Sequence, residues 1–114
     1  MKMSQQKLAE VLAKLCRIYV DVFGESIVKI MLYGSYARQA EDDESDIDVV
    51  AIVRGNRDTL QQQIRKVWDR ANDLDLEYDV VISPTVLPYD EFEYFKNAMP
   101  YYMNIEKEGI EIGA

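Results

Sequence analysis

The chain has 114 residues, enough for about one domain, and a chain of this length buries roughly two thirds of its unfolded surface. Its 21 acidic residues outnumber its 13 basic ones, and the net charge of −8 is the wrong sign for gripping nucleic acid through a broad basic surface. The sequence contains no histidine, which excludes imidazole catalysis and most zinc sites, so any chemistry must use carboxylates, hydroxyls, Lys, Arg or a bound metal.

The first half of the chain predicts one helix and two strands. Ser4 is a candidate N-cap, apolar residues follow at helical spacing, and Gly24 can end the helix. Residues 27–33 and 47–53 are short apolar runs rich in β-branched residues, which is typical of strands. Because the second run is apolar almost throughout, we expect it to be covered on both faces at the centre of a sheet.

The second half predicts a helix, a strand and a broken helix. Asp58 or Thr59 can cap the helix. Its expected buried stripe consists of Leu60, Ile64, Val67, Trp68 and Ala71. Alternating residues 76–82 predict a third strand that ends at Ser83-Pro84. The remainder predicts a short helix capped by Asp90 and interrupted by Pro100, a second helical piece up to Gly109, and a short edge strand near Ile110 and Ile112.

This element order, αββαβα, predicts a single α/β domain over residues 1–114. Cys16 is the one cysteine, and its place in the first helix predicts a small core residue rather than a disulfide or metal ligand. The first residues lack the apolar stretch of a signal peptide, and no run of 18 uncharged apolar residues occurs. We therefore expect a cytoplasmic protein that does not interact with a membrane.

The segment that predicts chemistry is Gly34-Ser35, followed after ten residues by Asp46-Ile47-Asp48 at the start of the central strand. Two residues apart on a strand, Asp46 and Asp48 point to the same side, where their carboxylates can share one hard cation such as Mg²⁺. A glycine and a hydroxyl at a strand end allow close approach to phosphate oxygens. A phosphate-binding turn and a pair of metal-binding carboxylates are thus predicted on neighbouring segments.

Asp79 is expected to supply a third carboxylate. It falls inside the predicted third strand, where a charge is costly unless it is paired or bound to metal. Asp73 and Asp75 are competitors that precede this strand and are expected to cap the helix end or face water. Residues 41–44 predict a solvated acidic loop. Three carboxylates, a phosphate-binding turn and no histidine together indicate phosphoryl or nucleotidyl transfer with metal ions.

Residues 34–38 (GSYAR), residues 45–50 (SDIDVV) and the later residues 79–82 (DVVI) resemble the minimal nucleotidyltransferases of the DNA polymerase beta superfamily, the antitoxin-like partners of HEPN-domain toxins. The resemblance extends from the leading helix to residues 108–110. It implies a nucleotidyltransferase fold, classed as α/β or α+β, with a small mixed β-sheet flanked by helices.

The resemblance also implies roles for individual residues. Gly34 and Ser35 would hold the nucleoside triphosphate, and Arg38 matches a position that is often basic and could contact a phosphate. Asp46 and Asp48 would bind two Mg²⁺ ions. Asp79 would complete one metal site and help to deprotonate the incoming hydroxyl.

One departure from the family pattern is Gln39, where glycine usually follows the basic residue. We interpret this as a reason to question catalytic rate rather than fold, because the metal-binding residues are intact.

The function implied is transfer of AMP from ATP to a hydroxyl, specifically a tyrosine of a cognate HEPN-type toxin, which this antitoxin would silence. Two alternatives remain open at this point. One is a catalytically weak or inactive antitoxin that neutralises its partner by binding to it in a hetero-complex. The other is an aminoglycoside-type nucleotidyltransferase, which is less favoured because the chain lacks a second domain to hold a small acceptor. A homo-oligomer is also possible, and no direct contact with nucleic acid is expected.

Overall fold

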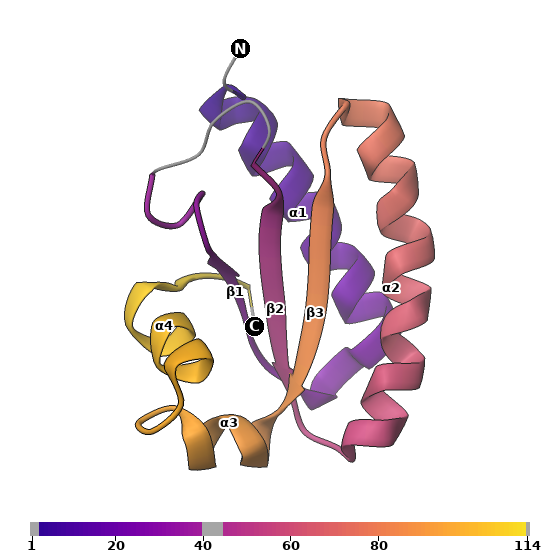
Figure 1. Ribbon diagram of the computed structural model, residues 1–114. Coiled ribbons are helices and arrows are strands. Elements are labelled where there is room, and N and C mark those ends of the chain that lie inside the picture. The colour runs from indigo at the N-terminus through magenta and orange to yellow at the C-terminus, as the bar shows by residue number, and fades with distance from the viewer. Residues whose placement is uncertain (1–2, 40–44, 114) are drawn as a thin grey trace.

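A computed structural model describes residues 3–39 and 45–113 and shows a mixed sheet with helices on both faces (Figure 1). The elements in chain order are α1 (Gln5–Phe23), the 3-10 turn η1 (Gly24–Ser26), β1 (Ile27–Tyr33), β2 (Ile47–Val53), α2 (Arg57–Tyr78), β3 (Ile82–Pro88), α3 (Tyr89–Phe95), α4 (Pro100–Glu108) and β4 (Ile110–Gly113). This confirms the predicted fold class. The predicted acidic loop at residues 41–44 lies outside the described residues. Within the described ranges, no helix is both long enough and apolar enough to cross a membrane.

The sheet has the strand order β3-β2-β1-β4, so β2 is internal, as its apolar run predicts. β1 runs antiparallel to both β2 and β4, whereas β2 and β3 are parallel. The register places Asp48 between Tyr33 of β1 and Ser83 of β3. The start of β2 is therefore flanked by the end of one strand and the start of another.

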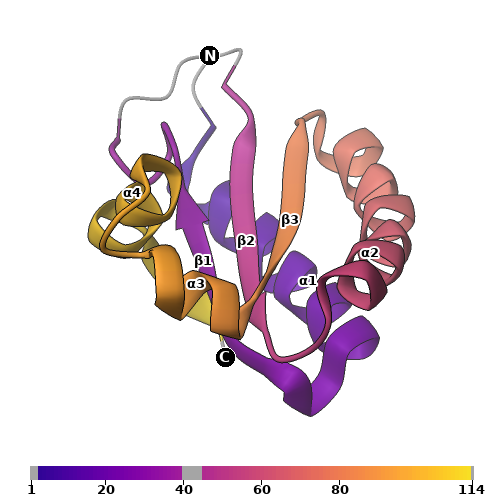
Figure 2. The same ribbon diagram turned by 60° about the horizontal axis from the view of Figure 1, so that its bottom comes forward.

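Two hydrophobic clusters cover the two faces of the sheet. Residues such as Ile47 and Val49 of β2 pack with α1 and α2, whereas Val50 and Ile52 pack with α3 and α4. Figures 1 and 2 show α1 behind the sheet and α3 and α4 in front of its lower part. No described helix lies in front of the upper ends of β2 and β3 (Figure 1). The start of β2 thus has one face left uncovered by helices.

The capping of the two long helices confirms one prediction and corrects another. The Ser4 hydroxyl accepts a hydrogen bond from the Lys7 amide at 3.1 Å, as expected of an N-cap. For α2 the cap is Asn56, whose Oδ1 accepts from the amides of Asp58 at 2.9 Å and Thr59 at 3.4 Å. The predicted cap at Asp58 or Thr59 is therefore wrong, because both residues already lie in the first turn.

Trp68 does not belong to the core stripe in which it was predicted. Its side chain is 43% exposed, and its indole N–H donates to the carbonyl of Pro84 at 2.8 Å. Gln61, two turns earlier on α2, donates to the carbonyl of Val86 at 3.4 Å. Both contacts are to the outer edge of β3, so α2 closes this edge with side-chain donors.

The predicted third strand over residues 76–82 is also wrong. α2 continues to Tyr78, and β3 begins only at Ile82. Prolines are tolerated in β3 because it is an edge strand. The Pro84 carbonyl points away from β2 and accepts the hydrogen bond of Trp68. Because the nitrogen and carbonyl of one strand residue point to the same side, the ring nitrogen of Pro84 also faces away from β2. A proline at such a position leaves the pairing with β2 intact.

Candidate active site

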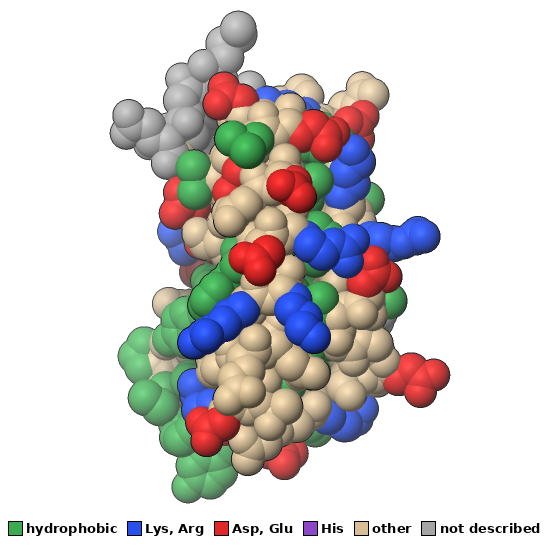
Figure 3. All heavy atoms as spheres, turned by 90° about the vertical axis from the view of Figure 1, so that its right-hand side faces the viewer, with side chains coloured by type: hydrophobic (Ala, Val, Ile, Leu, Met, Phe, Trp, Pro, Cys, Tyr) green, Lys and Arg blue, Asp and Glu red, His purple; other side chains and the backbone are tan. Residues whose placement is uncertain are grey.

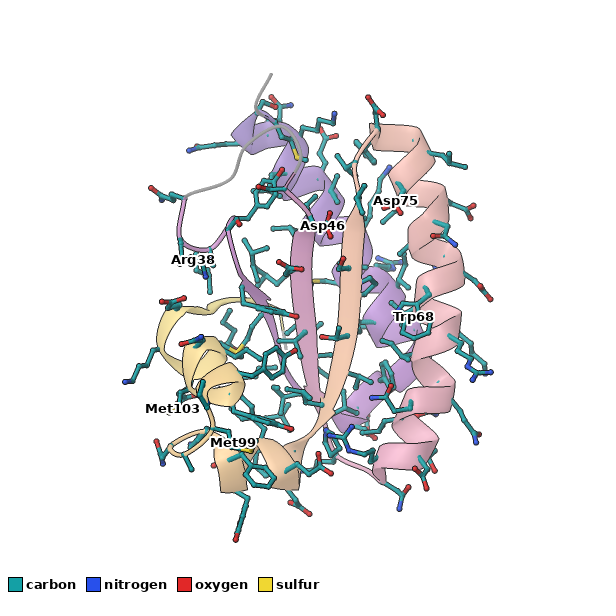
Figure 4. The ribbon with its side chains drawn as sticks, viewed as in Figure 1. Arg38, Asp46, Trp68, Asp75, Met99 and Met103 are labelled. Carbon is teal, nitrogen blue, oxygen red and sulfur yellow. The ribbon has the colours of Figure 1, made fainter. Side chains whose placement is uncertain are left out.

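Asp46 directly precedes β2 and Asp48 is its second residue. Figure 4 shows Asp46 at the upper end of β2, above α3 and α4. Ile47 between them is fully buried on the opposite face with α1 and α2. The alternation of side chains along a strand therefore brings the two carboxylates to the same side, as predicted. Asp46 is exposed and Asp48 is half-buried.

The electrostatics of Asp48 fit a site for a cation. Burial raises the pKa of Asp48 above its ordinary value, the neighbouring Asp46 carboxylate raises it further, and the charge of Arg38 lowers it. Two carboxylates that repel each other in a partly desolvated place have the oxygen ligands that Mg²⁺ prefers. The residues present therefore fit a divalent cation held by Asp46 and Asp48.

Gly34 packs directly against the Asp48 carboxylate. Its φ is +73°, and a Cβ placed on it would lie 2.4 Å from Asp48 Oδ2. Only glycine fits both the backbone conformation and the space. The turn that follows is closed by a 3.1 Å hydrogen bond from the Arg38 amide to the Gly34 carbonyl. Ser35, the second residue of this turn, is half-buried.

Arg38 is held beside the pair by the end of α4. Its Nη1 lies 3.3 Å from Glu108 Oε2, and both side chains are about half exposed. Figure 4 shows Arg38 on the turn at the end of β1, on the side of β2 away from β3. The positive charge of Arg38 thus stands near Asp48, where a ligand phosphate could meet it.

The structure does not bring Asp79 into this cluster. Asp79 is the exposed C-cap of α2 in the left-handed conformation, with φ +54°, and lies outside every strand. Over residues 3–39 and 45–113, no three acidic or cysteine side chains come close enough to share a metal ion. The expected cluster of three carboxylates is therefore replaced by a pair. The physical reason is that α2 extends one turn further than its sequence pattern indicated.

Ser83 lies near the pair and was missed by sequence reasoning, whereas Asp75 was weighed there against Asp79 and set aside as a helix cap or a solvent-facing residue. Ser83 is the register partner of Asp48, and its hydroxyl donates to Asp46 Oδ2 at 3.3 Å. Asp75 Oδ1 accepts from the Ile82 amide at 3.0 Å and thereby fixes the start of β3. Burial raises the pKa of Asp75, that hydrogen bond lowers it, and the charge of Asp46 raises it. Ser83 could have been identified if the third strand had been predicted at residues 82–88, because it then pairs with Asp48.

Tyr33 links the start of β2 to α4. It pairs with Asp48 across β1 and β2, and its hydroxyl lies 3.3 Å from that of Tyr101 on α4. Burial and the hydrogen bond with Tyr101 raise the pKa of Tyr33 above its ordinary value.

A sheet that presents paired carboxylates beside a glycine-serine turn defines the nucleotidyltransferase class of fold. Residues 10–108 match the family described as "Polymerase beta, Nucleotidyltransferase". The chain belongs to this family and is a nucleotidyltransferase, as predicted from its Gly34-Ser35 and Asp46-Ile47-Asp48 motifs.

Similar proteins extend this result. A putative protein adenylyltransferase of Methanocaldococcus jannaschii is 27% identical over 107 residues, which cover 93% of this chain and 99% of that protein. A toxin-antitoxin crystallised with AMP-PNP has a TM-score of 0.52 at 15% identity, over 93% of this chain and 73% of that one. A mutant of the toxin-antitoxin MntA-HpeT has a TM-score of 0.54 at 13% identity, over 90% and 73% of the two chains. At these identities, the two structures show the shared fold.

Proposed function

We propose that this protein is an antitoxin that transfers AMP from ATP to a tyrosine of a cognate HEPN-type toxin. The observation that carries the proposal is the contact between Gly34 and Asp48, which joins a phosphate-binding turn to a pair of acidic ligands. The name of the Methanocaldococcus jannaschii relative supports a protein acceptor, and the toxin-antitoxin structures of the same fold support a toxin as partner.

In this reaction, Asp46 and Asp48 would hold Mg²⁺, which would supply positive charge to offset that of the triphosphate and of the transition state. The turn at Gly34 and Ser35 cradles the phosphates, and Arg38 exchanges part of its contact with Glu108 for a phosphate oxygen. The phenol oxygen bonds to the α-phosphorus, the bond from that phosphorus to pyrophosphate breaks, and the phenolic proton passes to water.

A labelling experiment tests this proposal. The protein is incubated with Mg²⁺, a cognate HEPN-type toxin, and each of the four nucleoside triphosphates labelled at the α-phosphate. We expect label on the toxin with ATP, and its loss in the Asp46→Asn and Asp48→Asn variants. Absence of transfer from any nucleotide would refute the proposal.

A second candidate function is an antitoxin that acts by binding alone. Gln39 favours it, because this residue adopts φ +57° in the turn where the family pattern has glycine. A strained turn would hold phosphates less well. Cells that express the toxin distinguish the two functions: protection by the Asp46→Asn, Asp48→Asn double variant without labelling favours binding alone, and loss of protection favours transfer.

A further inference from the structure

The order of the strands indicates the side from which the acceptor hydroxyl approaches the α-phosphorus of ATP. A phosphoryl or nucleotidyl transfer needs the attacking and leaving oxygens roughly in line. The turn that cradles the phosphates follows β1, the carboxylate pair stands on β2, and β3 lies on the other side of β2. If pyrophosphate leaves toward the turn, the acceptor hydroxyl must arrive over β3. This step depends on the proposed function.

A hollow of about 270 Å³ lies where such an acceptor would arrive. It runs between α2 and the outer edge of β3. Its lining consists of Trp68, Ala71, Asn72, Ile82, Ser83 and Pro84. Ser83 connects the hollow to the carboxylate pair, since its hydroxyl also donates to Asp46 at 3.3 Å. Figure 4 shows Trp68 between α2 and β3, Asp75 near the upper end of the same gap, and Asp46 on the other side of β3 at the start of β2.

The chemistry of this hollow suits one aromatic side chain with a hydroxyl. The indole of Trp68 is fixed by its bond to Pro84, yet it is 43% exposed and offers an aromatic wall. Asn72 and Ser83 supply polar groups beside it. Drug-sized ligands occupy pockets of roughly 300 to 1,000 Å³, so this hollow is small for a nucleoside and adequate for a phenol.

A larger hollow of about 470 Å³ does not meet the same requirement. It is lined by residues that include Leu8, Leu32 and Tyr36, which pack in the cluster on the α1 side of the sheet. Its lining comes from α1, β1, the turn after β1 and β4, and includes no residue of β3, over which the acceptor must arrive.

We propose that the hollow between α2 and β3 binds the phenol ring of the acceptor tyrosine and directs its hydroxyl past Ser83 toward Asp46. The phenol oxygen forms the new bond to the α-phosphorus of ATP as the bond to pyrophosphate breaks, and the phenolic proton passes to water. Asn72 and Trp68 are then specificity-determining residues for the acceptor, with no part in holding the nucleotide.

The first test is direct, because Trp68 is the one tryptophan of the chain and its fluorescence reports on the hollow. The probe is N-acetyl-tyrosinamide, with N-acetyl-alaninamide as the control ligand. We expect a saturable change in Trp68 emission with the tyrosine probe alone. The Asn72→Phe variant, which fills the hollow from an exposed helix position, should abolish the change. Asp73→Phe, one residue further along the exposed part of α2, should retain it. Equal responses to both probes, or no saturable response, would overturn the proposal.

The second test separates the acceptor from the nucleotide. We expect Asn72→Phe to reduce AMP transfer to the toxin at least tenfold while leaving the affinity for a fluorescent ATP analogue unchanged, and Asp73→Phe to alter neither. Loss of analogue affinity in Asn72→Phe would show that the hollow holds the nucleoside instead, and unchanged transfer would show that it holds no acceptor. Absence of transfer by the unsubstituted protein would refute the proposed function itself, which keeps the two failures distinct.

Discussion

Gly34→Ala tests the contact that joins the turn to the carboxylate pair. The added Cβ would lie 2.4 Å from Asp48 Oδ2, whereas a carbon and an oxygen that are not bonded stay about 3.3 Å apart, so the carboxylate must move by roughly 0.9 Å. A left-handed alanine costs about 1 to 2 kcal/mol, and forcing the Asp48 side chain from its rotamer costs about 1 kcal/mol more. We expect a loss of about 2 to 3 kcal/mol in the free energy of unfolding.

Gly24→Ala is the matched control for this change. Gly24 has a similar φ of +59°, and nothing stands within 4 Å of its added Cβ. This variant should lose only the backbone contribution, about 1 to 2 kcal/mol. In an Asp48→Ala background, Gly34→Ala should cost no more than Gly24→Ala, because Asp48 Cβ lies at an ordinary 3.4 Å. Urea unfolding of the single and double variants measures these differences. Equal costs for the two glycines in the unsubstituted background would refute the reasoning.

Three further predictions concern the turn, a helix cap and pH. Gln39→Gly should raise the free energy of unfolding by about 0.5 to 1 kcal/mol, since it relieves a φ of +57°; a lower urea midpoint would contradict this. Asn56→Ala should cost about 1 kcal/mol by thermal unfolding, whereas Thr59→Ala should cost less than half of that; the reverse order would make Thr59 the cap. Because the pKa of Asp48 is raised on folding, the native state binds more protons between the unfolded and folded pKa values, and stability falls as pH rises through that window. Solvent screening keeps this loss small, and Asp48→Asn should remove it from a pH series of unfolding curves; an unaltered pH profile would place its source elsewhere.

The parts of the fold that local patterns determine could be predicted from the sequence. β1 and β2 occupy the predicted residues. The apolar run of β1 ends at Gly34 and that of β2 begins after polar residues, so the local sequence marks where each strand starts or stops. The same holds for the pairing of Asp46 with Asp48, which follows from the two-residue period of a strand.

The parts that depend on tertiary contacts could not be predicted. Residues 76–78 alternate like a strand but continue α2, and the true β3 contains Pro84 and Pro88. Prolines fit there only because β3 is at the sheet edge and turns their ring nitrogens outward, which no local pattern reveals. Ser83 was therefore missed beside the carboxylates, and Asp79 was assigned to a strand that does not include it.

The measurement that tests this account most directly is a Mn²⁺ titration, read by electron paramagnetic resonance, in the presence of a non-hydrolysable ATP analogue. If Asp46 and Asp48 are the protein ligands, Asp46→Asn and Asp48→Asn should each weaken Mn²⁺ binding at least tenfold. Asp79→Asn, which keeps a residue tolerant of the left-handed C-cap, should leave binding unchanged. Binding that survives the loss of either paired carboxylate, or that disappears with Asp79, would contradict the account.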